Sequence, residues 1–199
     1  MSDNTPLTGE HLALDLVNTH PYATDLLTTP AGLARWLALE SGRIPGESAR
    51  PTRADLELVR EVRAATAAAL GAVRRGERPP TDALEVLNRA QLDAPAVRRL
   101  GWDGTAVTAV SHRVGATAGR RVAGWLAEAA AELLSGPDAG RVRECEAPDC
   151  VMLFLPANPR RRWCSASRCG NRTRVARHYA RQKGAGREAE GAHGEAEGA

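Results

Sequence analysis

Four cysteines near the C-terminus are the residues whose type and spacing most clearly suggest chemistry. Cys145, Cys150, Cys164 and Cys169 follow the pattern C-x4-C-x13-C-x4-C, and they are the only cysteines among the 199 residues. Each pair closes a short loop, and a spacer long enough for a hairpin separates the two pairs, which is the layout that tetrahedral zinc requires. Because four thiolates fill the tetrahedron and leave no position for water, we predict one structural Zn²⁺ and no catalytic metal.

Two other arrangements of the cysteines stay open from the residues alone: four free thiols, or two disulfides. Residues 141–183 contain only nine sizeable apolar side chains besides the cysteines. A unit of about 40 residues with so small a core normally needs a metal or a disulfide to hold it together. Disulfides are rare in a reducing compartment, so zinc is the better explanation. His178 could replace a cysteine as a ligand, although we expect it on the solvent side of a helix.

The cysteines lie in the most basic part of the chain. Residues 141–183 carry 11 basic and 3 acidic side chains, a local charge of +8, whereas the whole chain carries +3. No Asp or Glu occurs between Val151 and Lys183. A merely solvated surface usually mixes both signs, so this clustering indicates contacts with phosphate. The predicted nucleic-acid-binding residues are Arg160, Arg161, Arg162, Arg172, Arg174, Arg177, His178 and Arg181.

Half of these residues share one face of an expected helix over 170–182. They follow the spacing i, i+3, i+4, i+7, as Arg174, Arg177, His178 and Arg181. Val175 and Tyr179 fall on the neighbouring face, and we expect them to pack against the preceding hairpin. Residues 160–162 are expected on a strand that enters Cys164. One alternative stays open: only Lys183 among the 27 basic residues is a lysine, so the arginines also fit a compositional bias and a solvated face.

The cysteine region is predicted to be a small unit of strands and one helix. The segments "RVREC" and "VMLFLP" suit short strands around the first cysteine pair, and Pro156 and Pro159 predict a turn before "RRRW" returns. A helix opens at the last cysteine. This order of knuckle, hairpin and helix is a treble-clef-like zinc finger.

The N-terminal part is predicted to be rich in helices. We expect helices over 29–42, 52–75, 81–92 and 116–134, and two short strands within 96–112 joined by a "WDG" turn. Residues 11–19 fit either a buried strand or a short helix, because most of them are apolar. Trp36, Trp102 and Trp125 are assigned to the core. The predicted fold class is therefore α+β, a helix-rich domain with short strands followed by the finger.

The segment "SGPDAG" marks the best candidate for a domain boundary. We predict one domain over 1–138, the finger over 139–183 and a disordered tail over 184–199. The composition, 43% hydrophobic and 26% charged, is typical of a soluble globular protein. No apolar run approaches the roughly 20 residues that span a bilayer, and the polar start does not resemble a signal peptide. We therefore predict a cytoplasmic protein with no membrane partner.

The stretch "RRRWCSASRCGNRTRVARHYARQ" resembles the CGNR zinc finger, whose tetrad stands here as residues 169–172. The segments "HLALDLVNTH", "LLTTPAGLARWL" and "GRVREC" are similar to landmarks of the ABATE domain, which precedes this finger in a family of proposed stress-induced transcription regulators. The resemblance covers about residues 8–183, and "LPANPRRRW" departs from the usual family pattern at the hairpin tip. It implies an α+β fold with a treble-clef-like finger and a role in DNA-binding transcription regulation. The zinc ligands that it implies are Cys145, Cys150, Cys164 and Cys169.

Three residues of the tetrad have two readings. Gly170 and Asn171 adjoin a ligand cysteine, so we expect them to shape the backbone around the metal. Arg172 fits two roles equally well: a structural role beside the metal, or a contact with a base of the nucleic acid.

The leading functional hypothesis is a regulator that binds DNA through the finger and is modulated by its N-terminal domain. The first alternative is an RNA-binding or ribosome-associated zinc module. The second is an enzyme or an adaptor that uses the finger as a scaffold. No nucleotide loop, nucleophile elbow or paired-carboxylate pattern appears in residues 1–140, so we predict that the chain is not an enzyme.

One polar group in the N-terminal part is dense enough to suggest a binding site for a small-molecule effector. The alternative is that these residues only cap and turn the chain after the first element. The group consists of Asp15, Asn18, Thr19, His20 and Tyr22.

Overall fold

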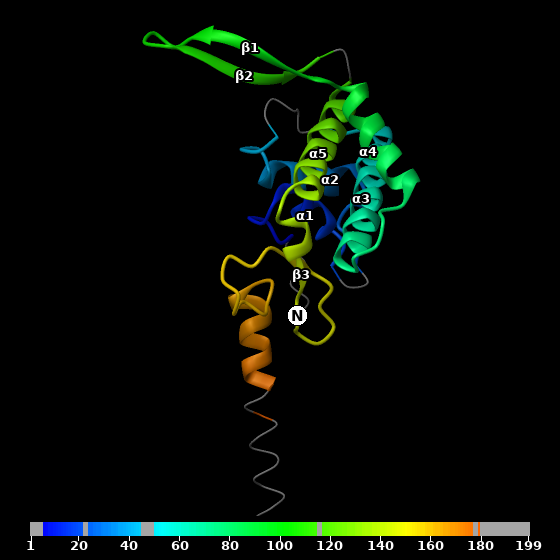
Figure 1. Cartoon of the computed structure of the whole chain (residues 1–199), viewed down its shortest axis with the longest axis vertical. Helices are drawn as coiled ribbons and strands as arrows, with labels where there is room; N and C mark the ends of the chain where they lie inside the picture. The colour runs from blue at the N-terminus through cyan, green and yellow to red at the C-terminus, as the bar shows by residue number, and fades with distance from the viewer. Residues whose placement is uncertain (1–5, 22–23, 45–49, 115–116, 177–178, 180–199) are drawn as a thin grey trace, which may run out of the picture.

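The computed structural model describes residues 6–21, 24–44, 50–114, 117–176 and 179. Helices form the body of the molecule, a two-stranded hairpin projects from one end, and the cysteine region lies at the other end (Figure 1). The α+β fold class is confirmed. The helices are α1 (Leu12–Val17), α2 (Pro30–Leu39), α3 (Arg53–Arg74), α4 (Thr81–Asp93) and α5 (Ala118–Ser135).

The long helices α3, α4 and α5 pack against one another and form the main part of the core. Helix α3 begins with a capping box, in which Thr52 and Asp55 bond each other's backbone amides. It ends before Gly76, whose φ of 72° lets the chain reverse into α4. The helices expected over 52–75 and 81–92 are therefore confirmed, and each begins and ends within about two residues of its expected limits.

The segment that fitted either a strand or a helix forms α1, at the centre of the core. Residues 12–16 are all buried, and His11 caps the helix by accepting a bond from the Ala13 amide at 3.4 Å. Because α1 is covered on all sides, its sequence carries no polar face and therefore no helical period.

The start of α5 crosses the start of α3 so closely that only glycine fits. A Cβ atom at Gly119 would lie 1.8 Å from Asp55 Oδ1, in the capping box of α3. We therefore expect Gly119→Ala to lower the free energy of unfolding by about 1 to 3 kcal/mol, measured by urea denaturation. Gly71→Ala is the matched control, because a Cβ there meets only the mobile end of Arg75 at 3.4 Å. That control is expected to be neutral or stabilising by up to about 1 kcal/mol, and equal losses in both variants would contradict the prediction.

Two strands form the projecting hairpin, as the "WDG" turn predicted. Strand β1 (Ala96–Trp102) pairs antiparallel with β2 (Val107–Arg113), and no other strand of the described residues joins them. The assignment of all three N-terminal tryptophans to the core is partly wrong. Trp36 is buried and Trp125 is half-buried, but Trp102 lies near the hairpin tip with 66% of its surface exposed.

The cysteine region contains less regular structure than expected. A short turn η1 (Ala139–Arg141) leads to two-residue strands β3 (Arg143–Glu144) and β4 (Leu153–Phe154), which pair antiparallel. A π-helical turn η2 (Ala166–Gly170) continues as an α-helix over 171–176. Residues 160–162 form a turn and irregular chain, so the expected strand entering Cys164 is wrong. Val175 and Tyr179 are exposed, so their expected packing against the hairpin is wrong too.

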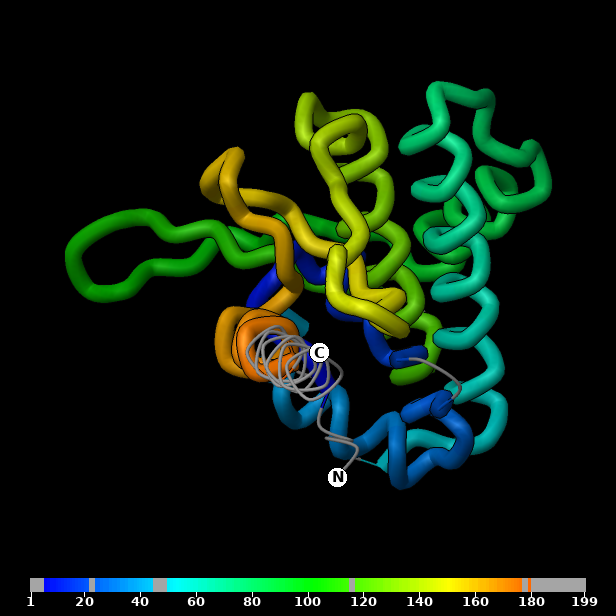
Figure 2. Tube along the Cα trace, turned by 90° about the horizontal axis from the view of Figure 1, so that it is seen from below, coloured from blue at the N-terminus to red at the C-terminus, as the bar shows by residue number. Residues whose placement is uncertain are grey.

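The finger and the helical body share their apolar contacts. Val142 and Leu153, from the finger, belong to the main core, whereas Leu7 packs against the cluster around the cysteines. Figure 2 shows the finger beside the N-terminal segment of the chain. The metal region therefore packs against the helical body and is not a separate unit.

Candidate metal centre and basic surface

The four cysteine side chains converge on one point. Their Sγ atoms all lie within 4.8 Å of one another, and no disulfide links them. Cys150 Sγ lies 3.8 Å from Cys164 Sγ and 3.6 Å from Cys169 Sγ, and the last two atoms are 3.6 Å apart. A zinc ion with Zn–S bonds of about 2.3 Å needs sulfurs about 3.8 Å apart, whereas a disulfide needs about 2.05 Å. The cysteines are thus positioned to bind one metal ion, and Zn²⁺ fits.

The backbone closes each cysteine pair with a different turn. In the first pair the Cys150 amide donates to the Ala147 carbonyl at 3.1 Å, and the Cys145 amide donates to the carbonyl of Met152, just before β4, at 2.9 Å. In the second pair the Gly170 amide donates to the Ser165 carbonyl, five residues earlier, at 3.0 Å. That wider π-type turn explains why four residues, and not the more familiar two, separate Cys164 from Cys169.

Three of the four thiols have shifted pKa values because they are buried and bonded to one another. The hydrogen bond from Cys164 lowers the pKa of Cys150 to about 5, and the same bond raises the pKa of Cys164. Burial is the main reason why the pKa of Cys169 rises to about 11. The Cys150 thiolate is therefore favoured over those of Cys164 and Cys169. A divalent ion would stabilise all four thiolates, which is the chemistry that a structural zinc ion supplies.

Arg172 lies against the metal centre. Its guanidinium donates to the Pro148 carbonyl at 3.1 Å and lies 3.8 Å from Cys169 Sγ. These contacts brace the first cysteine loop against the helix that follows the last cysteine. They favour a structural role for Arg172 over a contact with a base, the two alternatives that the sequence left open.

Gly170 and Asn171 differ in their surroundings. Gly170 is buried, and a Cβ there would lie 3.5 Å from the Trp163 ring, which is ordinary contact. Asn171 is exposed, and its side-chain oxygen accepts a bond from Arg174. The backbone amide of Gly170, which closes the π-type turn, therefore fits a structural role. The prediction for Asn171 stays untested.

Arg161 is half-buried and is held by an acid from the other end of the chain. Its guanidinium donates to Glu10 Oε1 at 2.5 Å and to the Cys164 carbonyl at 2.6 Å. It also lies over the Phe154 ring, 4.5 Å from the ring centroid. An arginine with these contacts has little left to offer a phosphate, so its contacts favour a structural role for Arg161. Its predicted contact with nucleic acid stays untested.

Arg162 and Arg160 are more accessible. Arg162 forms an ion pair with Glu146 at 2.5 Å, and the Glu146 amide bonds the Arg162 carbonyl at 3.0 Å. Arg160 is exposed at the turn. The segment that lacks acids in the sequence thus receives two acidic partners, Glu10 and Glu146, from outside it.

The helix after the cysteines presents Arg174 to solvent. This residue is exposed in the part of the helix that the structure describes. The other three members of its predicted face, Arg177, His178 and Arg181, lie outside the described residues, as does the predicted tail over 184–199.

Most of the polar group predicted near the first element serves the fold. Asp15 accepts from the Gly9 amide at 2.9 Å, and Thr19 donates to the Leu16 carbonyl at 2.6 Å. His20 is exposed, and Tyr22 lies outside the described residues. These contacts favour local hydrogen bonding over a ligand site. Asn18 does more than cap the chain, because it reaches strand β4, 135 residues away in sequence.

A buried network of charges, which the sequence reading missed, lies behind the finger. Arg43 donates to Asp15, to Glu40 and, at 2.7 Å, to the Glu10 carbonyl. Burial raises the pKa of Asp15 and of Glu40, because both carboxylates are removed from water, and the hydrogen bonds from Arg43 oppose that rise. The network ends on Glu10, which accepts from Arg161 and from the Leu155 amide at 3.0 Å. The available signal was Glu10 just before an apolar run and Asp15 within it.

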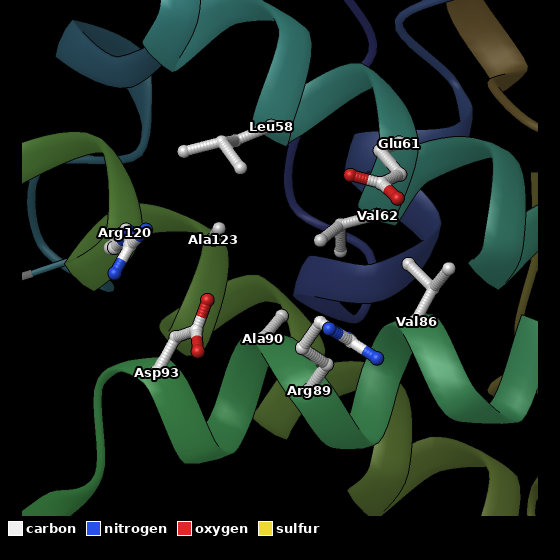
Figure 3. A pocket seen from close by; sticks show the side chains of 9 residues that line it. All are labelled: Leu58, Glu61, Val62, Val86, Arg89, Ala90, Asp93, Arg120 and Ala123. Carbon is white, nitrogen blue, oxygen red and sulfur yellow. The ribbon is translucent and has the colours of Figure 1, made fainter.

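Two hollows in the helical body differ in size. The first lies between α3, α4 and α5 and measures about 40 Å³, enough for about one water molecule. Figure 3 shows charged side chains from all three helices around it, among them Glu61, Arg89 and Arg120. The second, beside α2, measures about 560 Å³ and includes Asp25, Arg35 and Trp36 in its lining. A small-molecule effector would fit only the second, and the prediction of such an effector stays untested.

Comparisons with known protein families agree with this geometry. A family model named ABATE, described as "Putative stress-induced transcription regulator", matches residues 10–137, more than half of the chain. The chain belongs to the ABATE family. The model of the CGNR zinc finger matches residues 141–182 of this ABATE protein, so the resemblance predicted from the sequence is confirmed. No curated protein matches the chain. In the described residues, no helix is long and apolar enough to cross a membrane.

Proposed function

We propose that this ABATE protein is a cytoplasmic transcription regulator that binds DNA through the basic surface of its zinc finger. The observation that carries the proposal is the exposed Arg174, on a helix that begins at the metal centre. The sequence spacing predicts Arg177, His178 and Arg181 for the same face, and Arg160 is a further exposed charge of the finger. A rigid helix with a row of arginines is suited to tracking phosphates or entering a groove.

The contacts within the finger divide its arginines into two groups. Arg161 and Arg172 hold the finger to the body and the two cysteine loops to each other. Arg160, Arg162 and the helix face are left to meet DNA, with Arg162 partly neutralised by Glu146. The same surface would attract RNA, but few aromatic side chains stand near it for stacking on unpaired bases, which favours duplex DNA.

We assign a regulatory role to the N-terminal domain. Its Glu10 side chain accepts hydrogen bonds from Arg161 and from the Leu155 amide of the finger, and Arg43 donates to the Glu10 carbonyl. A ligand that moves α2 or the segment around Glu10 would therefore shift the finger directly.

Binding through arginines predicts a steep dependence on salt. We expect the affinity for genomic DNA fragments to fall linearly with salt on logarithmic axes, because each neutralised phosphate releases counterions. Arg174→Ala should reduce the slope by about 1 and weaken binding similarly for all sequences, if Arg174 contacts one phosphate. Fluorescence anisotropy at several salt concentrations measures both effects.

Arg89→Ala is the matched control, because this arginine is also exposed on a helix but lies in the body. It should leave both affinity and slope unchanged. Binding that is absent or insensitive to salt would contradict the proposal. Structured RNA that displaces the DNA at equal concentration would support the RNA-binding alternative.

A further inference from the structure

The hairpin β1–β2 carries an apolar face that nothing in the described residues covers. No other described helix or strand packs extensively against it, and it projects beyond the ends of α4 and α5 (Figure 1). Leu100 is 76% exposed and Val107 is 68% exposed, as exposed as the nearby Trp102. Exposed apolar groups of this size, gathered on one element, mark an interaction surface.

The pairing register places these side chains on one side of the hairpin. Leu100 lies opposite Ala109, and Trp102 lies opposite Val107, so all four project to the same face. The next pair on that face is Arg98 with Ser111. The face is thus apolar towards the tip and basic towards the base. We define it as the hairpin face, made of Arg98, Leu100, Trp102, Val107, Ala109 and Ser111.

The turn of the hairpin is closed by its own hydrogen bonds, and its base is anchored to the body. At the tip, Asp103 accepts from the amides of Thr105 and Ala106 at 2.8 and 2.9 Å. At the base, Arg113 is buried, pairs with Glu128 at 2.6 Å and lies over the Trp125 ring, 4.6 Å from the ring centroid. An isolated two-stranded ribbon is only marginally stable in water. The exposed apolar side chains of this anchored ribbon therefore need a second surface to cover them.

We propose that a second copy of this chain covers the hairpin face, so that two hairpins pack face to face about a twofold axis. An axis near Leu100 would place Trp102 of each copy over Arg98 of the other. Each guanidinium would then lie on an aromatic ring and not on another cation. The face carries no acid, and the one acid of the hairpin, Asp103, is engaged in the turn. The face is therefore complementary to itself, which is the requirement for a twofold contact.

The size of the face sets the strength of the dimer. Two seven-residue strands make a ribbon about 23 Å long. The contact would bury roughly 400 Å² on each copy, or roughly 800 Å² in total, which is below the roughly 1,000 Å² of a stable interface and is the size of a weak, transient one. We therefore expect a reversible dimer with a dissociation constant on the order of 10 µM. The finger lies at the opposite end of the molecule and stays uncovered (Figure 1). The inference does not depend on DNA binding.

Sedimentation of the zinc-loaded full chain over about 1 to 500 µM tests the dimer. Wild type should pass from monomer to dimer across this range. Leu100→Glu should weaken the dimer at least 30-fold, because it places two like charges beside the axis in a desolvated contact. Val110→Glu is the matched control: Val110 is also exposed, on the opposite side of the same hairpin. It should leave the dissociation constant within about twofold. Circular dichroism and zinc content check that each variant is folded.

Charge complementation identifies the occupant. Leu100→Glu and Leu100→Lys should each sediment as monomers, whereas an equal mixture should form dimers, because residue 100 of one copy faces residue 100 of the other. A wild type that stays monomeric throughout the range overturns the proposal. So does a dimer that survives in Leu100→Glu, or one that is lost equally in Val110→Glu. A mixture that stays monomeric excludes the twofold contact at Leu100.

Discussion

Replacing Cys164 by serine is expected to abolish zinc binding and to unfold the finger. Structural zinc supplies about 10 to 16 kcal/mol of apparent binding free energy at neutral pH, more than the small apolar cluster around the cysteines can replace. Zinc content per chain, measured by mass spectrometry, should fall from one to near zero. Hydrogen exchange should accelerate at the amides of Cys145 and Gly170, whose bonds close the two cysteine loops.

Ser167→Ala is the control for this change, because Ser167 is exposed within the same loop and bonds only the neighbouring Ser165 hydroxyl in the described contacts. It should retain one zinc per chain and native exchange rates. A chelator added to the wild type should reproduce the Cys164→Ser result. One tightly bound zinc in Cys164→Ser would contradict the four-cysteine site.

Asn18→Ala is expected to loosen the finger from the helical body. The Asn18 side chain donates to the Leu153 carbonyl at 2.9 Å and accepts from the Leu153 amide at 2.8 Å, so it replaces a neighbouring strand. Both partners are buried, and alanine would leave a donor and an acceptor without bonds. We expect a loss of about 2 to 4 kcal/mol in the free energy of unfolding, measured by urea denaturation.

Asn88→Ala provides the matched control, because Asn88 is exposed on α4. It should change the free energy of unfolding by less than about 0.5 kcal/mol. Hydrogen exchange in the Asn18 variant should rise at β4 before it rises in α3 and α5. Unchanged exchange at β4 would show that the finger does not depend on Asn18.

The elements with strong local signals were predictable from the sequence. Helix α3 has a long apolar stripe, a capping box and a terminal glycine, so its limits follow from nearest neighbours along the chain. Four cysteines in two pairs predicted a metal site for the same local reason. Helix α1 could not be told from a strand, because a helix that is buried on all sides has no helical period in its hydrophobic pattern. The boundary proposed at residue 138 stays a prediction, and the packing of Leu153 in the main core shows how closely the two parts are joined.

Exposure was less predictable than secondary structure. Trp102 was assigned to the core because large aromatic residues are usually buried, yet the hairpin carries it away from the body. Val175 and Tyr179 were placed against the hairpin of the finger by helical spacing, and they are exposed. Spacing along an element shows which residues share a face, but only the packing of elements decides what that face meets.

The sequence by itself determined the metal site, the helices and the concentration of arginines around the cysteines. The tertiary structure decided which arginines hold the protein together. Glu10 and Arg161 pair across 151 positions, and Asn18 reaches Leu153 across 135. Periodicity and composition describe neighbours along the chain, whereas ion pairs depend on distance in space. The absence of acids between residues 151 and 183 therefore described the sequence correctly, while folding brought in Glu10 and Glu146 and left Arg160 and Arg174 at the surface.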